Sequence, residues 1–133
     1  MTSDLALKVE KSLEEIHLSD ALSSIFDVIV RANKYIDETA PWALAKNPEN
    51  RNRLATVLYN LLETIRVCSI LLQPFMPSAM PKIWARIGVS ENEQTWLSAK
   101  TFGVLSQTTS VSLGEAIFPR INIEQEMQAL SEL

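Results

Sequence analysis

The sequence predicts an all-α protein, an antiparallel helix bundle with an extended C-terminal arm. Apolar residues recur at three- and four-residue intervals through most of the first 87 positions, which is the pattern of amphipathic helices. Prolines and one glycine divide this pattern into separate helices. The chain has 133 residues, 47% of them hydrophobic, and no internal repeat or Gly/Ser-rich linker, so we expect a single domain.

Two predicted helices precede Pro41. Residues 4–16 carry apolar residues on one face and charged residues opposite, and that apolar face is formed by Leu5, Val9, Leu13 and Ile16. Ser19 is expected to cap the second helix, because its hydroxyl can accept a hydrogen bond from an N–H group of the first turn. The second helix carries a broad stripe formed by Leu22, Ile25, Phe26, Ile29, Val30, Asn33 and Ile36. It is expected to end at Ala40, since proline disfavours helical geometry in the residue before it.

The third helix is the most strongly periodic segment of the chain. A short helical turn over residues 42–46 and a break at Asn47-Pro48 precede it, and Asn50 or Asn52 is expected to cap it. Its stripe comprises Leu54, Val57, Leu58, Leu61, Leu62, Ile65, Cys68, Ser69 and Leu72. Nearly every position from Val67 onward is apolar, so this end is expected to be buried on all sides.

Prolines and a glycine bound the fourth helix. Pro77 suits its first turn, and Gly88 is expected to end it. The apolar residues of this helix are Met80, Ile83, Trp84 and Ile87.

A polar segment without sustained periodicity follows Gly88. We expect it to lie over the bundle as an extended tail, anchored by Trp96 and Phe102. Residues 117–121 are expected to be extended because Pro119 blocks helical geometry in its neighbour. The predicted organisation is therefore a bundle with a trailing arm over residues 1–122, and a short C-terminal helix or tail over residues 123–133.

Composition excludes several classes of function. A net charge of −4 argues against generic binding of duplex nucleic acid, which depends on basic residues. One cysteine, Cys68, and one histidine, His17, exclude a disulfide framework and provide too few ligands for a metal site. Three glycines cannot build a phosphate-cradling loop, and neighbouring acids such as Glu14 and Glu15 diverge on a helix. We therefore expect no catalytic residues, no metal and no cofactor in this chain.

Membrane and secretory signals are also missing from the sequence. No run of 18 or more apolar residues is present, and no basic segment followed by an apolar core is found at the N-terminus. The expected location is the cytoplasm, without a membrane partner.

The net charge is unevenly distributed. Residues 1–30 carry a net charge of −4 and residues 67–133 carry −2, whereas residues 31–66 carry +2. That positive segment contains Trp42, which Pro41 holds in a defined direction. Five cations surround the tryptophan in the sequence, namely Arg31, Lys34, Lys46, Arg51 and Arg53. A tryptophan beside cations is suited to stack an unpaired nucleotide base.

A core role for the same residues is the alternative. Trp42 would then seal one end of the bundle, and the basic residues would form a solvated face. Asn33 interrupts the apolar stripe of the second helix, and it would need a hydrogen-bond partner if it were buried.

Three segments resemble the anticodon-binding domain of methionyl-tRNA synthetases, which are class I enzymes. They are Ala32-Asn33-Lys34-Tyr35-Ile36-Asp37-Glu38-Thr39-Ala40-Pro41-Trp42, Leu58-Tyr59-Asn60-Leu61-Leu62-Glu63 and Ile70-Leu71-Leu72-Gln73-Pro74-Phe75-Met76-Pro77. Ile117-Phe118-Pro119-Arg120-Ile121 is similar to a sequence near the end of these enzymes. The resemblance covers approximately residues 15–122 and implies the helical anticodon-binding fold of class I synthetases.

The resemblance implies roles for three residues. Trp42 would stack on the first base of the CAU anticodon of methionine tRNA, Pro41 would orient it, and Asn33 would support it. Arg31, Lys34 and Lys46 are predicted from their charge alone to contact phosphates of the anticodon stem.

The chain also departs from these enzymes. Nothing resembles the His-Ile-Gly-His or Lys-Met-Ser-Lys-Ser signatures, and the first helix of the family's anticodon domain is not found. We therefore expect a C-terminal fragment of an ATP-dependent methionine–tRNA ligase, without the catalytic domain that would use ATP and Mg²⁺. Its expected partners are the anticodon loop of the tRNA and the catalytic domain of the same parent chain.

Other functions remain open from the sequence. The anticodon domain of another class I synthetase has the same helical architecture, although the Ala-Pro-Trp corner weighs against it. A helical protein-interaction module would have Trp42 buried. A small all-α enzyme is the third alternative, and the lack of catalytic groups argues against it.

Overall fold

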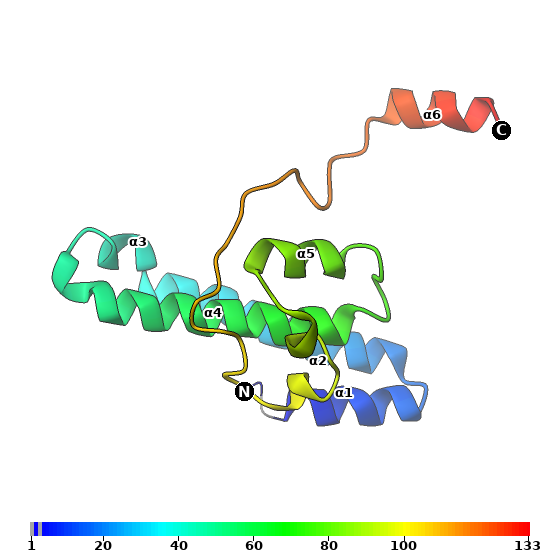
Figure 1. The fold of residues 1–133 in the computed structure, drawn as a ribbon. Coiled ribbons are helices and arrows are strands. Elements are labelled where there is room, and N and C mark those ends of the chain that lie inside the picture. Colours follow the sequence, from blue (N-terminus) through cyan, green and yellow to red (C-terminus); the bar gives the residue numbers. More distant parts are fainter. Residues whose placement is uncertain (1, 3) are drawn as a thin grey trace.

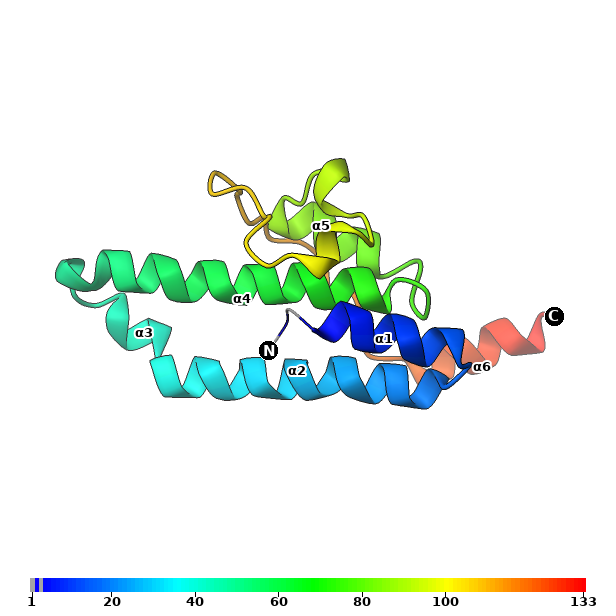
Figure 2. The ribbon, with the colours of Figure 1, turned by 90° about the horizontal axis from the view of Figure 1, so that it is seen from below.

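A computed structural model describes residue 2 and residues 4–133, and this part of the chain is helical without strands. The two long helices, α2 (Leu18–Thr39) and α4 (Arg51–Leu72), lie side by side and run antiparallel. The shorter helix α1 (Leu5–Glu14) packs along one half of this pair, as Figure 2 shows. The predicted all-α bundle is thereby confirmed.

Three further α-helices and three 3₁₀ turns, Pro48–Asn50, Glu91–Glu93 and Ser98–Lys100, complete the described structure. The single turn α3 (Pro41–Leu44) and the 3₁₀ turn Pro48–Asn50 connect α2 to α4, and α5 (Met80–Ile87) packs on α4. The last helix, α6 (Ile123–Ser131), lies at the end of an arm that leads away from the bundle (Figure 1).

The hydrophobic core occupies only one half of the long helix pair. Its members come from α1, α2, α4, α5 and the following segment, and include Leu5, Val9, Ala21, Ile25, Val28, Val67, Leu71, Met80, Trp84, Ile87 and Leu105. Every residue from Val67 to Leu72 is buried, as the apolar run predicted. The other half of the pair, where α3 joins α2 to α4, extends beyond α1 (Figure 2).

The turn between α1 and α2 differs from the prediction. Ile16 is 79% exposed and has a φ of 60°, so it ends α1 in the left-handed conformation instead of packing with Leu13. The backbone N–H of His17 donates to the carbonyl of Ser12 at 2.7 Å, which closes a Schellman motif around Ile16. His17 precedes α2 directly and no side chain caps that helix, so the capping role predicted for Ser19 is wrong.

The apolar stripe predicted for α2 is too broad. Phe26 is 48% exposed and Val30 is 65% exposed, whereas Ala21 and Val28, which the predicted stripe omitted, are buried. The core face of α2 is the narrower stripe of Ala21, Ser24, Ile25 and Val28, and Phe26 and Val30 lie outside it.

Helix α4 with the preceding turn, Pro48–Leu72, is long and apolar enough to cross a membrane, with a mean hydropathy of 1.4 over its most apolar 18 residues. Its packing is that of a core helix. The C-terminal half is enclosed by α1, α2 and α5, and it contains the charged residues Glu63 and Arg66. Asn50 occupies the N-cap position but its side chain makes no capping hydrogen bond.

The start and end of α5 follow from its proline and its glycine. Pro81 lies in the first turn, so Pro77, predicted for that position, instead belongs to the preceding connection. Gly88 ends the helix with a φ of 68°. A Cβ at Gly88 would lie 2.9 Å from the carbonyl oxygen of Ser110, so the arm passes close to this helix end.

A buried ion pair on α4 fastens the segment that follows α5. Glu63 and Arg66 are both completely buried, and the Arg66 Nη2 lies 2.7 Å from the Glu63 Oε1. The Glu63 carboxylate accepts backbone N–H bonds from Gly103, Val104 and Leu105 at 2.8 to 3.2 Å. The Arg66 guanidinium donates to backbone carbonyls of Glu93, Ser98 and Thr101 at 2.8 to 3.2 Å. Two charged side chains thus hold residues 93–105, a segment that otherwise contains only short 3₁₀ turns.

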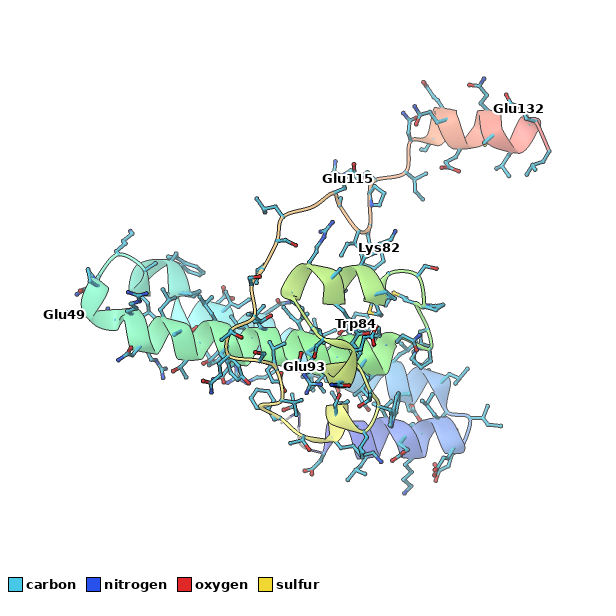
Figure 3. All side chains as sticks on the ribbon, in the orientation of Figure 1. Glu49, Lys82, Trp84, Glu93, Glu115 and Glu132 are labelled. Carbon is cyan, nitrogen blue, oxygen red and sulfur yellow. The ribbon has the colours of Figure 1, made fainter. Side chains whose placement is uncertain are left out.

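The anchors of this segment are partly different from those predicted. Trp96 is half-buried against the core, as expected. Phe102 is 40% exposed, and Leu105 is the buried anchor in its place. Glu93, labelled in Figure 3, is also buried, and its carboxylate accepts the backbone N–H bonds of Ser90 and Ser106 at 2.8 Å.

Beyond Leu105 the chain forms the predicted extended arm. The backbone N–H of Ser112 donates to the carbonyl of Arg86 at 2.8 Å, and residues 113–133 lie on the surface with only Ile117 partly buried. Asn122 caps α6 by accepting the N–H of Glu124 at 3.1 Å.

Candidate functional site

The corner that joins α2 to α4 is defined here as residues 40–53 and called the Trp42 corner. Ala40 ends α2 with φ 42° and ψ 63°, a left-handed conformation that turns the chain sharply before Pro41. The carbonyl of Ala40 accepts the N–H groups of Ala43 and Leu44 at 2.8 and 3.2 Å, which forms the single turn α3. Pro41 lies at the first position of this turn, where its fixed φ suits a helix start.

Backbone hydrogen bonds continue through the rest of the corner. The N–H of Asn47 donates to the carbonyl of Leu44 at 3.3 Å, and the N–H of Asn50 donates to the carbonyl of Asn47 at 3.0 Å. The Asn47 side chain accepts the N–H of Glu49 at 3.0 Å. The position of Trp42 is therefore set by a hydrogen-bonded connection between two long helices rather than by a loose loop.

Trp42 is 57% exposed on this corner. The alternative in which it seals the bundle end as a core residue is therefore wrong, and so is the form of the protein-interaction alternative that required it to be buried. Its surroundings explain the exposure, because the core lies in the opposite half of the helix pair. An exposed indole on a rigid support offers its face for stacking.

Asn33 lies one and a half turns before the end of α2 and is exposed, so it needs no buried partner. It stands at the edge of an apolar groove of about 210 Å³ between α2 and α4. The other residues of this groove are Ile29, Ala32, Ile36, Leu61, Thr64, Ile65 and Cys68.

The three predicted phosphate contacts differ in their surroundings. The Nη1 of Arg31 lies 3.1 Å from the Oε2 of Glu38, and the Nζ of Lys34 lies 3.9 Å from the Oε1 of the same carboxylate. Lys46 is exposed, and it has no acidic partner within 4 Å among residues 2 and 4–133. Arg51 and Arg53, which the predicted site residues omit, are also exposed and have no acidic partner within 4 Å in the described part of the chain.

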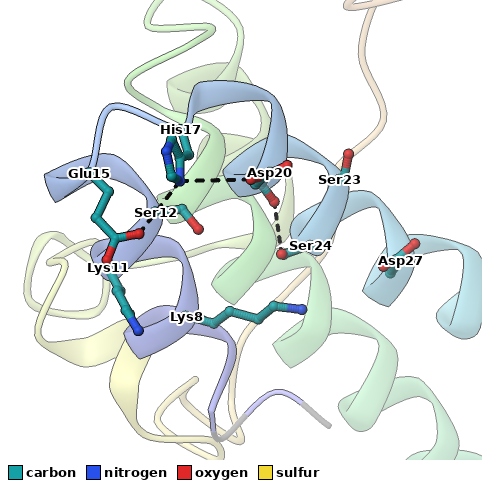
Figure 4. Close-up of a pocket in the computed structure, with 9 residues that line it drawn as sticks. All are labelled: Lys8, Lys11, Ser12, Glu15, His17, Asp20, Ser23, Ser24 and Asp27. Carbon is teal, nitrogen blue, oxygen red and sulfur yellow. Dashed lines mark hydrogen bonds and ion pairs between the residues drawn. The ribbon is translucent and has the colours of Figure 1, made fainter.

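A second surface cleft lies between α1 and α2 and holds the single histidine (Figure 4). Its volume is about 480 Å³. The Nδ1 of His17 is 3.5 Å from the Oε2 of Glu15 and 3.9 Å from the Oδ2 of Asp20. Ser24 donates to the backbone carbonyl of Asp20 at 2.8 Å and not to the imidazole, so the histidine does not activate this hydroxyl.

Cys68 is buried, and the metal-ligating residue types are dispersed over the described residues. Burial raises the pKa of the Cys68 thiol to about 12, which leaves it protonated and unreactive at neutral pH. Within the part of the chain that the structure describes, no three His, Cys, Asp or Glu side chains gather as metal ligands.

Comparison with known proteins gives a consistent result. The family described as the anticodon binding domain of methionyl tRNA ligase matches residues 1–132. The chain is 46% identical over 132 residues to a methionine–tRNA ligase of Caldanaerobacter subterraneus subsp. tengcongensis. It is 45% identical over 126 residues to that of Halalkalibacterium halodurans. These matches cover 99% and 95% of this chain but 20% and 19% of the relatives, so the chain spans about a fifth of their length.

Solved structures show the same relationship. The methionyl-tRNA synthetase of Mycobacterium tuberculosis, bound by methionyl-adenylate, matches with a TM-score of 0.81 at 28% identity, over 89% of this chain and 23% of that one. Its apo form matches with a TM-score of 0.81 at 30% identity, over 91% of this chain and 25% of that one.

Proposed function

We propose a function from the premise that this chain belongs to the family of anticodon-binding domains of methionyl-tRNA ligases. In this proposal, the chain reads the CAU anticodon of methionine tRNA at the Trp42 corner. The single observation that carries this proposal is the exposure of Trp42 on a hydrogen-bonded support. Proteins read RNA sequence mostly at unpaired bases, which they splay out and stack on aromatic side chains. The corner provides one such aromatic surface at the end of a long helix.

Trp42 would stack on the first anticodon base, the cytosine of CAU. Pro41 would fix the direction of the indole, because the proline ring locks the backbone immediately before it. Asn33, exposed on the same helix α2 that leads into the corner, would support the reading of the loop with its amide group. These three residues constitute the proposed base-reading site.

The chemical reaction would take place elsewhere. The matched relatives are about five times as long as this chain, and one solved relative binds methionyl-adenylate. We place the catalytic domain, which would use ATP and Mg²⁺, in the remainder of a longer cytoplasmic ligase chain. The helical domain would then report the identity of the anticodon to that catalytic domain through the bound tRNA.

The test is a titration of the chain with an RNA hairpin that carries the CAU anticodon loop, followed by fluorescence anisotropy of the labelled RNA. Replacing Trp42→Ala removes the stacking surface, and a stacked base contributes about 1–3 kcal/mol, so affinity should fall by about 5- to 150-fold. The variant should also bind hairpins with C and with A at the first anticodon position almost equally.

Phe118→Ala is the matched control, since Phe118 is 67% exposed on the arm, away from the corner. It should leave both affinity and discrimination unchanged. Unaltered discrimination in Trp42→Ala would overturn the proposal.

A further inference from the structure

The positive charge of residues 31–66 belongs almost entirely to one part of the fold. Residues 31–38, the end of α2, contain two basic and two acidic side chains, and residues 63–66 contain one of each. Residues 39–62 contain Lys46, Arg51 and Arg53 against the single acid Glu49, a net charge of +2. The whole positive excess is therefore located on the Trp42 corner and the first turns of α4.

The structure separates the cations of α2 from those of the corner. Glu38 pairs with both Arg31 and Lys34, and with the neighbouring Asp37 it brings the net charge of residues 31–38 to zero. Lys46, Arg51 and Arg53 are exposed, and in the described part of the chain no carboxylate lies within 4 Å of their charged nitrogens. A cation without a fixed partner loses no ion pair when it contacts a phosphate.

The corner also fixes these cations relative to Trp42. Lys46 donates its backbone N–H to the carbonyl of Ala43, the residue that follows Trp42, at 3.3 Å. Arg51 and Arg53 lie in the first turn of α4, two positions apart, so they project from roughly opposite sides of the helix. An RNA strand crossing this helix end would have one guanidinium on each side.

The remaining charges at this end of the molecule favour an anion as well. The partial positive charge of the N-terminus of α4, a helix of 22 residues, adds to that of the arginines. Glu49 is the one acidic residue of the Trp42 corner, and Figure 3 shows it at the outer edge of the corner.

We infer that Lys46, Arg51 and Arg53 form the phosphate-binding set of this domain, and that they hold the sugar–phosphate backbone of the anticodon loop beside the base stacked on Trp42. The inference rests on the proposed function and adds to it the residues that contact the RNA backbone. It replaces two of the three contacts predicted from charge, since Arg31 and Lys34 are already paired.

Two double variants with the same change in net charge test this assignment. Arg51→Gln/Arg53→Gln removes two free cations, and Arg31→Gln/Lys34→Gln removes two paired ones. The dissociation constant of the CAU hairpin is measured for each between 50 and 200 mM salt, roughly the range over which phosphate contacts are screened. Circular dichroism checks that each variant is folded.

Each phosphate contact contributes about 0.7–0.9 to the slope of log affinity against log salt, so the Arg51/Arg53 variant should lose about 1.4–1.8 of that slope. Lys46→Gln should lose about half as much. The Arg31/Lys34 variant should keep its slope, and all three variants should keep their preference for C at the first anticodon position.

Equal loss of slope in the two double variants would overturn the assignment, because net charge alone would then explain the effect. A larger loss in the Arg31/Lys34 variant would overturn it in favour of α2. In both cases a loss of base preference in Trp42→Ala would still support the proposed function. If, in addition, Trp42→Ala kept its base preference, the proposed function would be wrong as well.

Discussion

Glu63 and Arg66 show at the scale of single residues how two charges can organise an irregular segment. A buried charge is costly unless it is paired and fully hydrogen-bonded. Here the carboxylate has Arg66 and three backbone N–H groups as donors, and the guanidinium has backbone carbonyls of residues 93–101 as acceptors. The pair satisfies peptide groups of a segment that contains only short 3₁₀ turns and no α-helix or sheet. The pair stabilises the fold by providing hydrogen-bond partners for these buried backbone groups.

This pair could not be predicted from the sequence. Opposite charges three residues apart on a helix usually form an exposed pair that contributes little. The apolar run that predicted burial begins only at Val67, just after Arg66. The information that was missing is tertiary, namely that the segment around Gly103 and Leu105 returns to this side of α4.

The pair gives the fold a defined dependence on pH. Burial by itself raises the pKa of Glu63, but the hydrogen bonds from Arg66, Val104 and Gly103 outweigh it and hold the pKa below its ordinary value of 4.5. A carboxyl with a lowered pKa in the folded state contributes stability that is present above the unfolded pKa. That contribution is lost as the pH falls through the folded pKa. We therefore expect the free energy of unfolding to decrease below about pH 4.5, as measured by urea unfolding between pH 7 and pH 3.

Glu63→Gln isolates this effect. It leaves Arg66 as an unpaired buried charge, so the variant should be about 3–5 kcal/mol less stable at pH 7 and should lose less stability on acidification. Glu10→Gln removes the half-exposed pair with Lys100 and should cost less than about 1 kcal/mol. Parallel pH profiles for the wild type and Glu63→Gln would contradict the assignment.

At the scale of elements, the periodic pattern predicts the helices, and a proline and a glycine predict the ends of two of them. The helices over residues 5–14, 18–39, 51–72 and 80–87 all appear where apolar spacing placed them. The C-terminal ends of the first, second and last of these helices are set by a residue in a left-handed conformation. Gly88 does so as expected, whereas Ile16 and Ala40 do so without being glycine. Local sequence carries no signal for an isoleucine in that conformation.

Ile16 is the more strained of these two ends, because a β-branched side chain is poorly tolerated at positive φ. Its side chain is 79% exposed and contributes little packing in return. We expect Ile16→Gly to raise the free energy of unfolding by about 1 kcal/mol, since glycine relieves the left-handed conformation at this helix end. Urea unfolding measures the change.

Leu18→Gly is the matched control for this substitution. Leu18 is also exposed, but it lies in the first turn of α2 with helical geometry, so glycine should destabilise the protein by about 0.5–1 kcal/mol there. Loss of stability in Ile16→Gly would mean that the side chain packs in solution.

The Trp42 corner illustrates what the sequence can say about the site. Pro41 predicts the end of α2 and a fixed direction for Trp42, because a proline restricts the backbone on both sides. Charge counting locates the positive segment correctly. The sequence does not show which cations have an acidic partner. The structure does, because the Glu38 carboxylate pairs with both Arg31 and Lys34.

At the scale of the whole molecule, packing is concentrated at one end and the proposed binding residues at the other. The core joins α1, α5 and residues 89–105 to one half of the α2–α4 pair. The other half has a groove along its seam and carries the Trp42 corner. The residues that stabilise the fold are thus largely different from those proposed to bind RNA. Substitutions on the corner should therefore change binding without unfolding the bundle.

The arm is the second consequence of this uneven packing. Its apolar side chains, among them Leu113, Phe118, Ile121 and Met127, are exposed, and α6 stands away from the bundle (Figure 1). Composition predicted the extended character of this segment but not the point at which packing ends. The last fully buried residue is Leu105, and the last backbone bond to the bundle is that of Ser112 to Arg86.

We therefore expect deletion of residues 113–133 to change the free energy of unfolding by no more than about 0.5 kcal/mol, because the deleted part buries no complete side chain. Deletion from residue 103 onward should cost several kcal/mol, since it removes Leu105 and the three N–H donors of Glu63. Urea unfolding of the two truncated chains and the full chain distinguishes these effects. A large loss from the shorter deletion would show that the arm packs on the bundle in solution. Equal stability of the full chain and the shorter truncation would place the end of the cooperative unit near Ser112, ahead of the boundary at residue 122 that the sequence predicts.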